Sequence, residues 1–240
     1  AIHSPEFSHL KMLLYWPVFF VLFMIEERVL QLNYRPMHCA LDDIIPFCEW
    51  FVIPYVGWYL LIVWSLGYFA VYSVEHFKGL QKYIMVTQAV AMVCYILFPT
   101  RQDLRPTEFE RENFLTQCVG ILYAFDTNTG VCPSLHCAYS IGIASVWLKK
   151  KAAHWAWKGF VVVAVILICL STTFIKQHSA VDFFAAIPLG ILAGLVLHLP
   201  AFWIYTALKI DQVIKCVWCY QRLRSGKWLK RIHGAGKPAK

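Results

Sequence analysis

The sequence predicts an all-α fold, a bundle of six transmembrane helices. Of its 240 residues, 59% are hydrophobic and only 15% are charged, whereas soluble domains carry about a quarter charged residues. The mean hydropathy is +0.55, and the apolar residues fall into long runs separated by polar segments, as membrane-spanning helices require. The length suits one compact bundle better than two soluble domains.

The spans are expected at six apolar runs. The first run, Met12 to Ile25, has only 14 residues, so we expect it to be extended by a turn at either end. The charged segment Glu26-Glu27-Arg28 follows it in place of a small-x-small cleavage site, which favours a span over a cleaved signal peptide. The six expected spans are 12–25, 50–74, 83–98, 134–148, 159–174 and 180–208.

Polar segments connect these spans. Residues 26–49 are expected to form a polar loop, and residues 75–82 and 149–158 short basic turns. Pro99 is expected to end the third helix, because proline lacks the N–H that a helix needs. A longer polar loop follows, and within it residues 114–125 are mildly amphipathic and predict a helix at the membrane interface.

The basic residues are concentrated on one side of the predicted membrane. That side holds both termini and the two basic turns, with sixteen of the 22 Lys and Arg and only three of the 14 Asp and Glu. The positive-inside rule assigns it to the cytoplasm, so residues 1–208 form the membrane domain and 209–240 a basic cytoplasmic tail. The net charge of +8 is explained by this topology and by a tail suited to anionic lipid, so no nucleic-acid role is expected.

Three polar clusters are predicted to meet on the opposite, outward side, each at the mouth of a helix. They are residues 98–106, residues 132–136 and residues 171–182. Together they supply two histidines, a carboxylate four residues after one of them, and three cations. Pro133-Ser134 also begins a predicted helix, whose free N–H groups favour an anion. Enzymes that act on phosphate and other oxyanions use cations and N–H donors of this kind. The sequence therefore predicts an active site at the extracytoplasmic helix mouths.

The residues of these clusters carry a family resemblance. The chain resembles the membrane branch of the type 2 phosphatidic acid phosphatase superfamily, whose three motifs are Lys-x6-Arg-Pro, Pro-Ser-Gly-His and Ser-Arg-x5-His-x3-Asp. Arg105-Pro106 matches the end of the first motif, and Pro133-Ser134-Leu135-His136 matches the second except at Leu135. Ser171 with His178-x3-Asp182 matches the third. The resemblance runs from about the second span to the sixth.

Two positions depart from the family pattern. Phe98 stands where the first motif has lysine, and Thr172 where the third has arginine. Arg101 and Lys176 are nearby cations that could substitute for them. The Pro-Ser-Leu-His form is similar to the branch that includes inositol phosphorylceramide synthases and, more distantly, sphingomyelin synthases, which transfer a phospho-headgroup to a lipid alcohol.

The resemblance implies a mechanism. His178 would attack phosphorus and form a phosphohistidine, Asp182 would orient it, and His136 would protonate the leaving alkoxide and then activate the acceptor. The groups expected to hold the phosphoryl oxygens are Arg105, Arg101, Lys176 and Ser134. No cofactor is implied, and a metal bound by the histidines and carboxylate is disfavoured because the neighbouring cations would repel it.

Several alternatives stay open at this stage. Arg101 and Arg105 could be interfacial residues paired with nearby acids, and Lys176 faces the same ambiguity. A lipid phosphatase acting on a monoester or diphosphate is the leading interpretation, a headgroup phosphotransferase the second, and a non-catalytic bundle that binds or transports anionic lipid the third. A bacterial plasma membrane suits the chain, with an internal eukaryotic membrane as the alternative. The particular lipid and the oligomeric state are left open.

Overall fold

The structure, a computed structural model, describes residues 5–28 and 33–196 and is mostly helical. Helices account for nearly all of its regular elements, and the strands are two residues long. In chain order the elements are the 3₁₀ helix η1 (Pro5–Leu14), α1 (Tyr15–Arg28), β1 (Arg35–Pro36), η2 (Glu49–Phe51), α2 (Val52–Tyr72), α3 (Val74–Leu97), β2 (Thr100–Arg101), α4 (Phe114–Phe125), α5 (Leu135–Lys149), α6 (Trp155–Phe174) and α7 (Ala180–Val196).

Four helical segments are long and apolar enough to cross a membrane, by length and composition. They are Phe7–Arg28, Glu49–Tyr72, Val74–Leu97 and Trp155–Phe174. Their outward side chains are apolar, as in Leu60 and Val71, which are 72% and 74% exposed. Such an exterior indicates a membrane protein. At the other two predicted spans lie α5, with 15 residues, and α7, with 17; the rest of the sixth predicted span and the basic tail lie outside the described residues.

One predicted connection is wrong. Residues 75–82, expected as a basic turn, form the first two turns of α3, and the chain reverses at Ser73 instead. The charges of Glu75, Lys78 and Lys82 are spaced three or four residues apart, so they share one solvated face of a helix. The Ser73 hydroxyl and Nδ1 of His76 lie 2.6 Å apart at this helix start.

Two local predictions are confirmed. The third helix ends at Leu97, directly before Phe98-Pro99. The predicted helix at residues 114–125 is α4, and Asn113 caps it reciprocally with Thr116: each side chain accepts from the backbone N–H of the other. Such a capping box satisfies two N–H groups that the first helical turn would otherwise leave without a partner.

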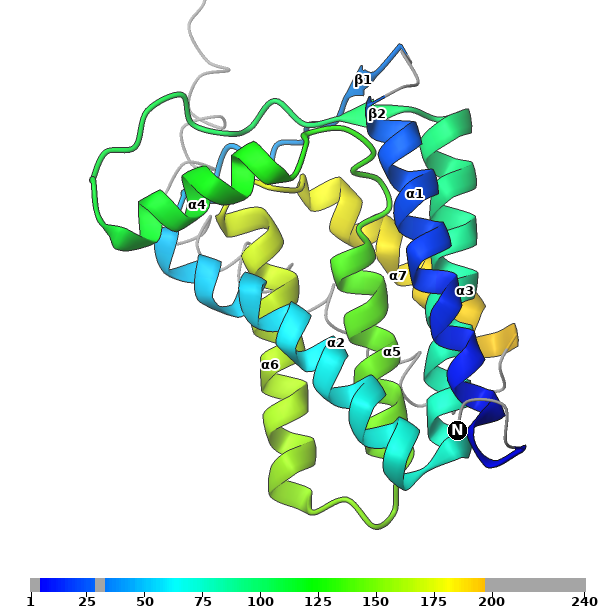
Figure 1. Cartoon of the computed structure of the whole chain (residues 1–240). Coiled ribbons are helices and arrows are strands. Elements are labelled where there is room, and N and C mark those ends of the chain that lie inside the picture. Colours follow the sequence, from blue (N-terminus) through cyan, green and yellow to red (C-terminus); the bar gives the residue numbers. More distant parts are fainter. Residues whose placement is uncertain (1–4, 29–32, 197–240) are drawn as a thin grey trace, which may run out of the picture. The chain divides into compact units, whose positions relative to one another are not determined.

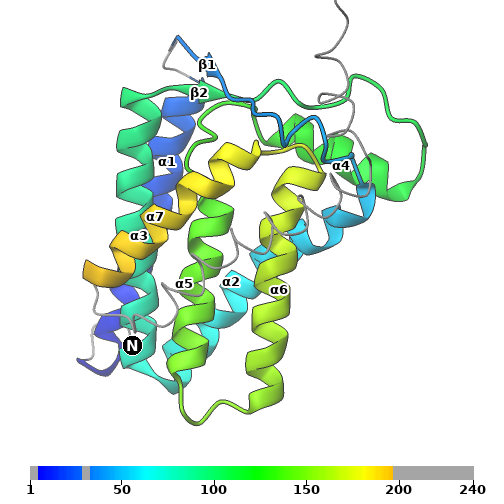
Figure 2. The same cartoon turned by 180° about the vertical axis from the view of Figure 1, so that it is seen from behind.

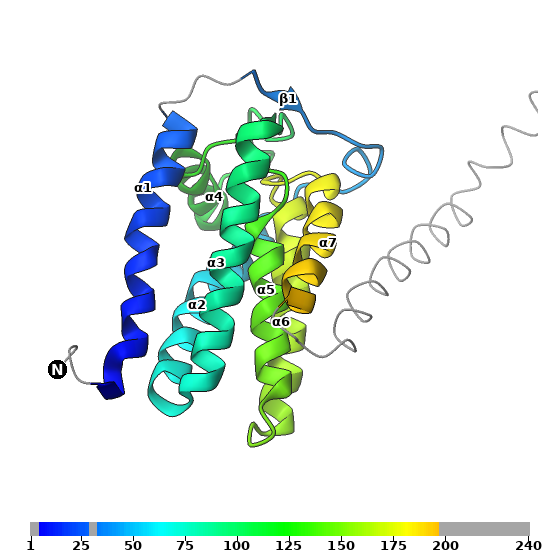
Figure 3. The ribbon, with the colours of Figure 1, turned by 90° about the vertical axis from the view of Figure 1, so that its right-hand side faces the viewer.

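α5 lies at the centre of the bundle. It packs against α2, α3, α6 and α7, while α1 packs against α3. Figure 3 shows α1 on one side of α2 and α3, and α5, α6 and α7 on the other. Gly142 permits a close approach of α5 to α3, because a Cβ there would collide with the ring of Tyr83 on α3.

The three polar clusters meet at one end of the bundle. β1 pairs in parallel with β2, and Arg101 forms a bridge with Thr129, so the loops after α1, α3 and α4 are joined. Cys48 donates its N–H to the carbonyl of Phe174, which joins the loop before α2 to the end of α6. Figures 1 and 2 show these loops and α4 gathered at the end from which α5 and α7 begin.

Candidate active site

His178 lies in the tight connection between α6 and α7. The backbone N–H groups of Gln177 and His178 both donate to the carbonyl of Thr172, at 3.0 and 2.9 Å. Lys176 takes a left-handed conformation there (φ 54°), which non-glycine residues seldom adopt. The turn therefore holds the His178 backbone against the last turn of α6.

Asp42 holds the other side of this turn. Its carboxylate accepts from the Ser179 hydroxyl at 2.6 Å and from the N–H of Ala180 at 2.8 Å. It thus satisfies donors at the start of α7 from a loop more than a hundred residues away. Sequence patterns do not reveal this role of Asp42, because the contact joins two segments far apart in the chain.

The imidazole of His178 is buried and oriented by two oxygen atoms. Its Nδ1 lies 3.1 Å from the carbonyl oxygen of Val131 and 3.4 Å from Oδ2 of Asp182. Asp182 is fully buried, and its Oδ2 also accepts from the N–H of Ser179 at 2.9 Å. Because both neighbours of Nδ1 are acceptors, this nitrogen carries the proton and the lone pair remains on Nε2. Nε2 is then available as a nucleophile.

The protonation of His178 is set by opposing effects. Burial disfavours the charged imidazolium, but the hydrogen bond and the negative charge of Asp182 outweigh it, so the pKa of His178 lies above its ordinary value of 6.5. Asp182 therefore stabilises the positive charge that His178 would gain on forming a bond through Nε2.

His136 lies beside His178 at the start of α5. The two ring centroids are 5.9 Å apart. The His136 ring is held between Tyr55 and Trp58 of α2, at centroid distances of 4.3 and 4.0 Å. It is 8% exposed, and its Nε2 has no hydrogen-bond partner among the described residues. A buried nitrogen without a partner is costly unless a ligand or water satisfies it.

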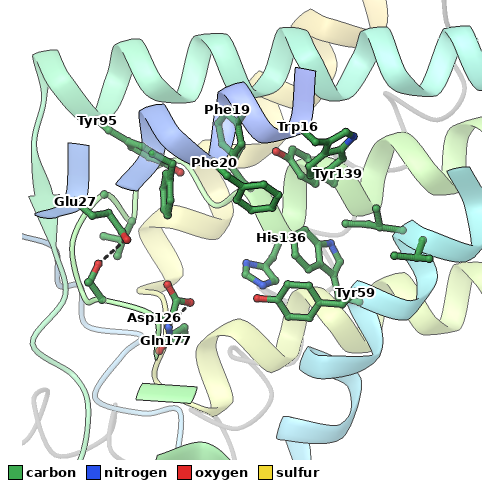
Figure 4. A pocket seen from close by; sticks show the side chains of 18 of the residues that line it. Trp16, Phe19, Phe20, Glu27, Tyr59, Tyr95, Asp126, His136, Tyr139 and Gln177 are labelled. Atoms are coloured by element: carbon green, nitrogen blue, oxygen red, sulfur yellow. Dashed lines mark hydrogen bonds between the residues drawn. The ribbon is translucent and has the colours of Figure 1, made fainter. Parts of the chain in front are cut away.

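Both histidines line one cavity of about 570 Å³. Most of its wall is apolar and aromatic and is formed by α1, α2 and α5. The polar residues Glu27, Asp126 and Gln177 lie together on one side of the cavity, and His136 lies nearer its middle (Figure 4). Phe20 and Val63 line it while being 55% and 71% exposed. The cavity therefore opens between α1 and α2, on the apolar exterior, and has the polarity of an amphiphile: a polar end and a long apolar part.

Arg105 lies near this cavity but does not line it. Its guanidinium donates to the carbonyls of Tyr123, Asp126 and Thr127 and to the side chain of Gln177, at 2.8 to 3.1 Å. It also stacks over the Tyr123 ring. These bonds fix the segment that follows α4, and with it the carboxylate of Asp126.

Of the other three predicted phosphate-binding groups, Arg101 and Lys176 are bound to protein oxygens and Ser134 is not. Arg101 is exposed and pairs with Asp103 at 3.1 Å, as the alternative sequence interpretation expected. Lys176 donates to the carbonyl of Asp42 at 2.8 Å and to that of Ile45; burial lowers the pKa of its ammonium group, and the nearby aspartates oppose this. Ser134 is buried at the start of α5, and its hydroxyl has no partner among the described residues.

The two residues that depart from the family motifs, Phe98 and Thr172, present no charge to the cavity. Phe98 is 64% exposed at the end of α3, and it does not line the cavity of the two histidines. Thr172 is buried, and its hydroxyl donates to the carbonyl of Cys169 at 2.8 Å. Thr172 thus supports the turn that carries His178, and its side chain presents no charge.

Sequence reasoning missed the polar cavity residues Glu27, Asp126 and Gln177. The available signal was position: Glu27 follows the first apolar run, and Asp126 follows the amphipathic segment, both on the predicted outward side. It also missed Tyr55 and Trp58 as neighbours of His136, because these contacts join α2 to α5 across about eighty residues of sequence.

Within residues 5–28 and 33–196, no three His, Cys, Asp or Glu side chains are grouped as metal ligands. Comparison of the chain with protein-family models, with curated proteins and with solved structures finds no match. The site therefore consists of an oriented imidazole, a second histidine beside it, and an amphiphilic cavity that both rings line.

Proposed function

We propose that the protein is an integral membrane enzyme that transfers a phosphoryl group from a lipid through a phosphohistidine on His178. The observation that carries this proposal is the pair of histidines at the polar end of an otherwise apolar cavity, with Nδ1 of one histidine facing a buried carboxylate. A lipid phosphate has the matching polarity. The resemblance to the type 2 phosphatidic acid phosphatases, carried by His136, His178 and Asp182, supports the same chemistry.

The mechanism proceeds in two displacements. In the first, Nε2 of His178 attacks phosphorus, the bond from phosphorus to the lipid oxygen breaks, and His136 donates a proton to the leaving alkoxide. In the second, His136 takes a proton from the acceptor hydroxyl, whose oxygen displaces His178 from phosphorus. Asp182 holds the proton of Nδ1 throughout and stabilises the imidazolium. The residues invoked need no metal or other cofactor.

The membrane arrangement is part of the proposal. Six spans place the histidines at the extracytoplasmic ends of α5 and α7, with residues 209–240 as a basic cytoplasmic tail. The distribution of Lys and Arg supports this orientation. A plasma membrane, of bacterial type, would then present lipid phosphates of the outer leaflet to the cavity mouth.

Hydrolysis of a phosphate monoester or diphosphate is the simplest form of this reaction, with water as acceptor. Headgroup transfer from a phosphodiester lipid to an alcohol is the second candidate, and one observation favours it. Arg101, Arg105 and Lys176 are bound to protein oxygens, so the cavity is better matched to the single negative charge of a diester than to the dianion of a monoester.

The test uses purified full-length protein in detergent, with EDTA present. Phosphate release is measured from phosphatidic acid and from isoprenyl mono- and diphosphate, and headgroup transfer from phosphodiester lipids with an added lipid alcohol. Turnover, together with an acid-labile, alkali-stable phosphoryl label on the protein, is expected for the wild type. His178→Ala should lose both. His38→Ala is the matched control, because His38 is an exposed histidine whose Nε2 lies 2.8 Å from Asp43.

The outcomes separate the three interpretations. Phosphate release that requires His178 and survives EDTA identifies a lipid phosphatase. Transfer that appears only with the alcohol identifies a phosphotransferase. Neither activity and no label, with lipid binding intact in His178→Ala, would overturn the enzyme proposal in favour of a bundle that binds or transports anionic lipid.

A further inference from the structure

The helix α1 forms one wall of the cavity and is held against the bundle at few points. Of its 14 side chains, only Phe19 and Glu26 are buried. The cavity opens between α1 and α2, and Figure 3 shows α1 on one side of α2 and α3. Segments with few buried contacts are the ones that move most readily. Glu26, in the last turn of α1, is therefore one of two anchors of a wall that can be displaced.

Glu26 is an unusual anchor because its carboxyl group is both ionisable and enclosed. The residue is 1% exposed, and neither Oε1 nor Oε2 has a hydrogen-bond partner among the described residues. Gly130 makes room for the carboxyl group, since a Cβ there would lie 3.2 Å from Oε2 of Glu26 and 3.5 Å from the ring of Tyr95. A buried charge without a partner is strongly unfavourable. The packed position of Glu26 therefore suits the neutral carboxylic acid and not the carboxylate.

The neighbouring groups do not compensate a charge on Glu26. The charged and titratable groups around it are Glu27, Arg28, Tyr34, Tyr95, Arg105 and Asp126. No ion pair within the described residues includes Glu26. Arg28 is exposed, and the guanidinium of Arg105 is bound to backbone carbonyls and a glutamine side chain. Glu27 is itself an acid, so its charge repels a carboxylate on Glu26.

One further contact holds this end of α1. Thr127, in the loop after α4, donates its hydroxyl to Oε1 of Glu27. Both the neutral and the charged form of a glutamate accept such a bond. Ionisation of Glu27 therefore does not break its contact, whereas ionisation of Glu26 makes its enclosed position unfavourable.

We propose that Glu26 is a pH-dependent latch that holds α1 closed over the cavity. In the neutral form its side chain packs between Tyr95 and Gly130 and keeps the last turn of α1 against the bundle. When Glu26 ionises, the carboxylate leaves this position for a hydrated one, the end of α1 moves away from α3, and the opening between α1 and α2 widens. The inference concerns access to the cavity and goes beyond the proposed phosphoryl transfer, on which it does not depend.

The direction of the pH effect follows from the burial of Glu26. The closed form disfavours the carboxylate and the open, hydrated form does not, so the closed form is fully stable at low pH and loses stability as the pH rises. Over this range each pH unit weakens the closed form by up to about tenfold, until Glu26 is ionised in both forms. Higher pH therefore favours entry and release of lipid.

The first experiment measures hydrogen exchange of the full-length protein in detergent, corrected for the pH dependence of intrinsic exchange. Between about pH 5 and about pH 9, a range that covers buried glutamates, we expect the protection of residues 19–28 to fall about tenfold or more relative to α5 and α6. Glu26→Gln, which is neutral at every pH, should keep α1 protected throughout. Glu75→Gln is the matched control, because Glu75 is an exposed carboxylate at the start of α3, and it should retain the wild-type pH dependence.

A further variant separates the two neighbouring glutamates. Glu27→Gln keeps an acceptor for the Thr127 hydroxyl and should retain the pH dependence. A pH dependence that is lost in Glu27→Gln and kept in Glu26→Gln would overturn the inference, as would wild-type protection of α1 that does not change with pH. The wild-type measurement requires no substitution, and Glu26→Leu is a second neutral variant for use where Glu26→Gln does not fold.

The second experiment measures lipid release, so that movement of α1 is connected to the cavity. His178→Ala protein is loaded with a fluorescent short-chain phosphatidylglycerol, and its release is followed after a jump in pH. We expect release to be about tenfold faster at the higher pH, and independent of pH once Glu26→Gln is added. Histidines titrate in the same range, and the comparison with Glu26→Gln removes their contribution.

The outcomes distinguish the latch from the proposed chemistry. Release that depends on pH equally with and without Glu26→Gln, or that does not depend on pH at all, would overturn the role of Glu26 in lipid access. A pH-dependent release that requires Glu26 supports the latch, and it does so even in a protein that forms no phosphohistidine.

Discussion

The two faces of α5 differ in how their polar groups are satisfied. On the face toward α3, the Tyr83 hydroxyl donates to the carbonyl of Ala138 at 3.0 Å, and Gly142 lets the helices touch. On the face toward α1 and α2, His136 and Tyr139 line the cavity, and each has a buried polar atom without a partner among the described residues. The face toward α3 thus makes a direct helix–helix hydrogen bond, whereas the cavity face presents buried polar atoms that a ligand or water can satisfy.

This difference separates structural from chemical roles within one helix. Substitutions on the face toward α3 should act on stability, and substitutions on the cavity face should act on chemistry.

His136→Asn should lower turnover by about 10² to 10⁴-fold, the usual contribution of a general acid or base. Asparagine keeps a polar group between Tyr55 and Trp58 but cannot carry the proton. The loss should shrink for a lipid analogue with a nitrophenolate leaving group, which departs without protonation. An equal loss for both substrates, in stopped-flow assays of the first displacement, would assign His136 a structural role instead.

Asp182→Asn should move the pH dependence of turnover. In the proposed mechanism the neutral form of His178 is the nucleophile. Its pKa is raised above 6.5 by Asp182, so wild-type activity should rise with pH through a midpoint above 6.5. Removing the carboxylate charge removes the interaction that raises the pKa of His178, whereas burial still lowers this pKa. The midpoint should therefore fall. The maximal rate should also fall, by about ten- to a hundredfold, because the imidazolium loses about 1.4 to 2.7 kcal/mol of stabilisation. The midpoint is measured from profiles of kcat/KM against pH. An unchanged midpoint in Asp182→Asn would contradict the proposed influence of Asp182 on His178.

Sequence patterns were sufficient where the signal is local. Pro99 marked the end of α3, and the amphipathic segment at 114–125 proved to be a helix. His178 and Asp182 are four residues apart, so their contact required only that the chain turn helical nearby. The turn expected at 75–82 failed because charged residues were taken as a sign of a loop, although their spacing equally suits the exposed side of a helix.

Tertiary contacts determine several roles in the site that local sequence patterns could not predict. Arg105 was identified from a motif, but its partners come from segments up to 72 residues away, and they turn its charge toward backbone carbonyls. Asp42 was assigned no role, yet it holds the turn of His178 from 137 residues away. Glu27 and Asp126 enter the cavity because the loops after α1 and α4 meet. Pairings of this kind depend on packing, which periodicity and spacing do not encode.

Gly142→Ala should destabilise the protein by about 1 to 3 kcal/mol, because the added methyl group overpacks the contact with Tyr83. Gly57→Ala on α2 is the matched control, since a Cβ there meets nothing within 4 Å, and alanine in a helix is favoured by about 0.5 to 1 kcal/mol. Thermal unfolding in detergent should therefore move in opposite directions for the two variants. Unfolding temperatures that change alike would mean that α3 and α5 are not closely packed at this point.

Phe20→Ala should give the smallest effect, and this effect should be specific to the apolar part of the cavity that opens between α1 and α2. Phe20 lines the apolar part of the cavity and is 55% exposed, so its removal costs the fold little but withdraws apolar surface from a bound acyl chain. Losing contact with one or two methylenes is worth about 0.8 kcal/mol each, which raises KM several-fold for long-chain lipids and leaves short-chain lipids unaffected. Leu60→Ala removes an apolar side chain from the exterior of α2, outside the cavity wall. It should change the KM of neither long-chain nor short-chain lipids. A KM increase that does not depend on chain length would place the lipid elsewhere, because only a chain lying against Phe20 can make the loss depend on its length.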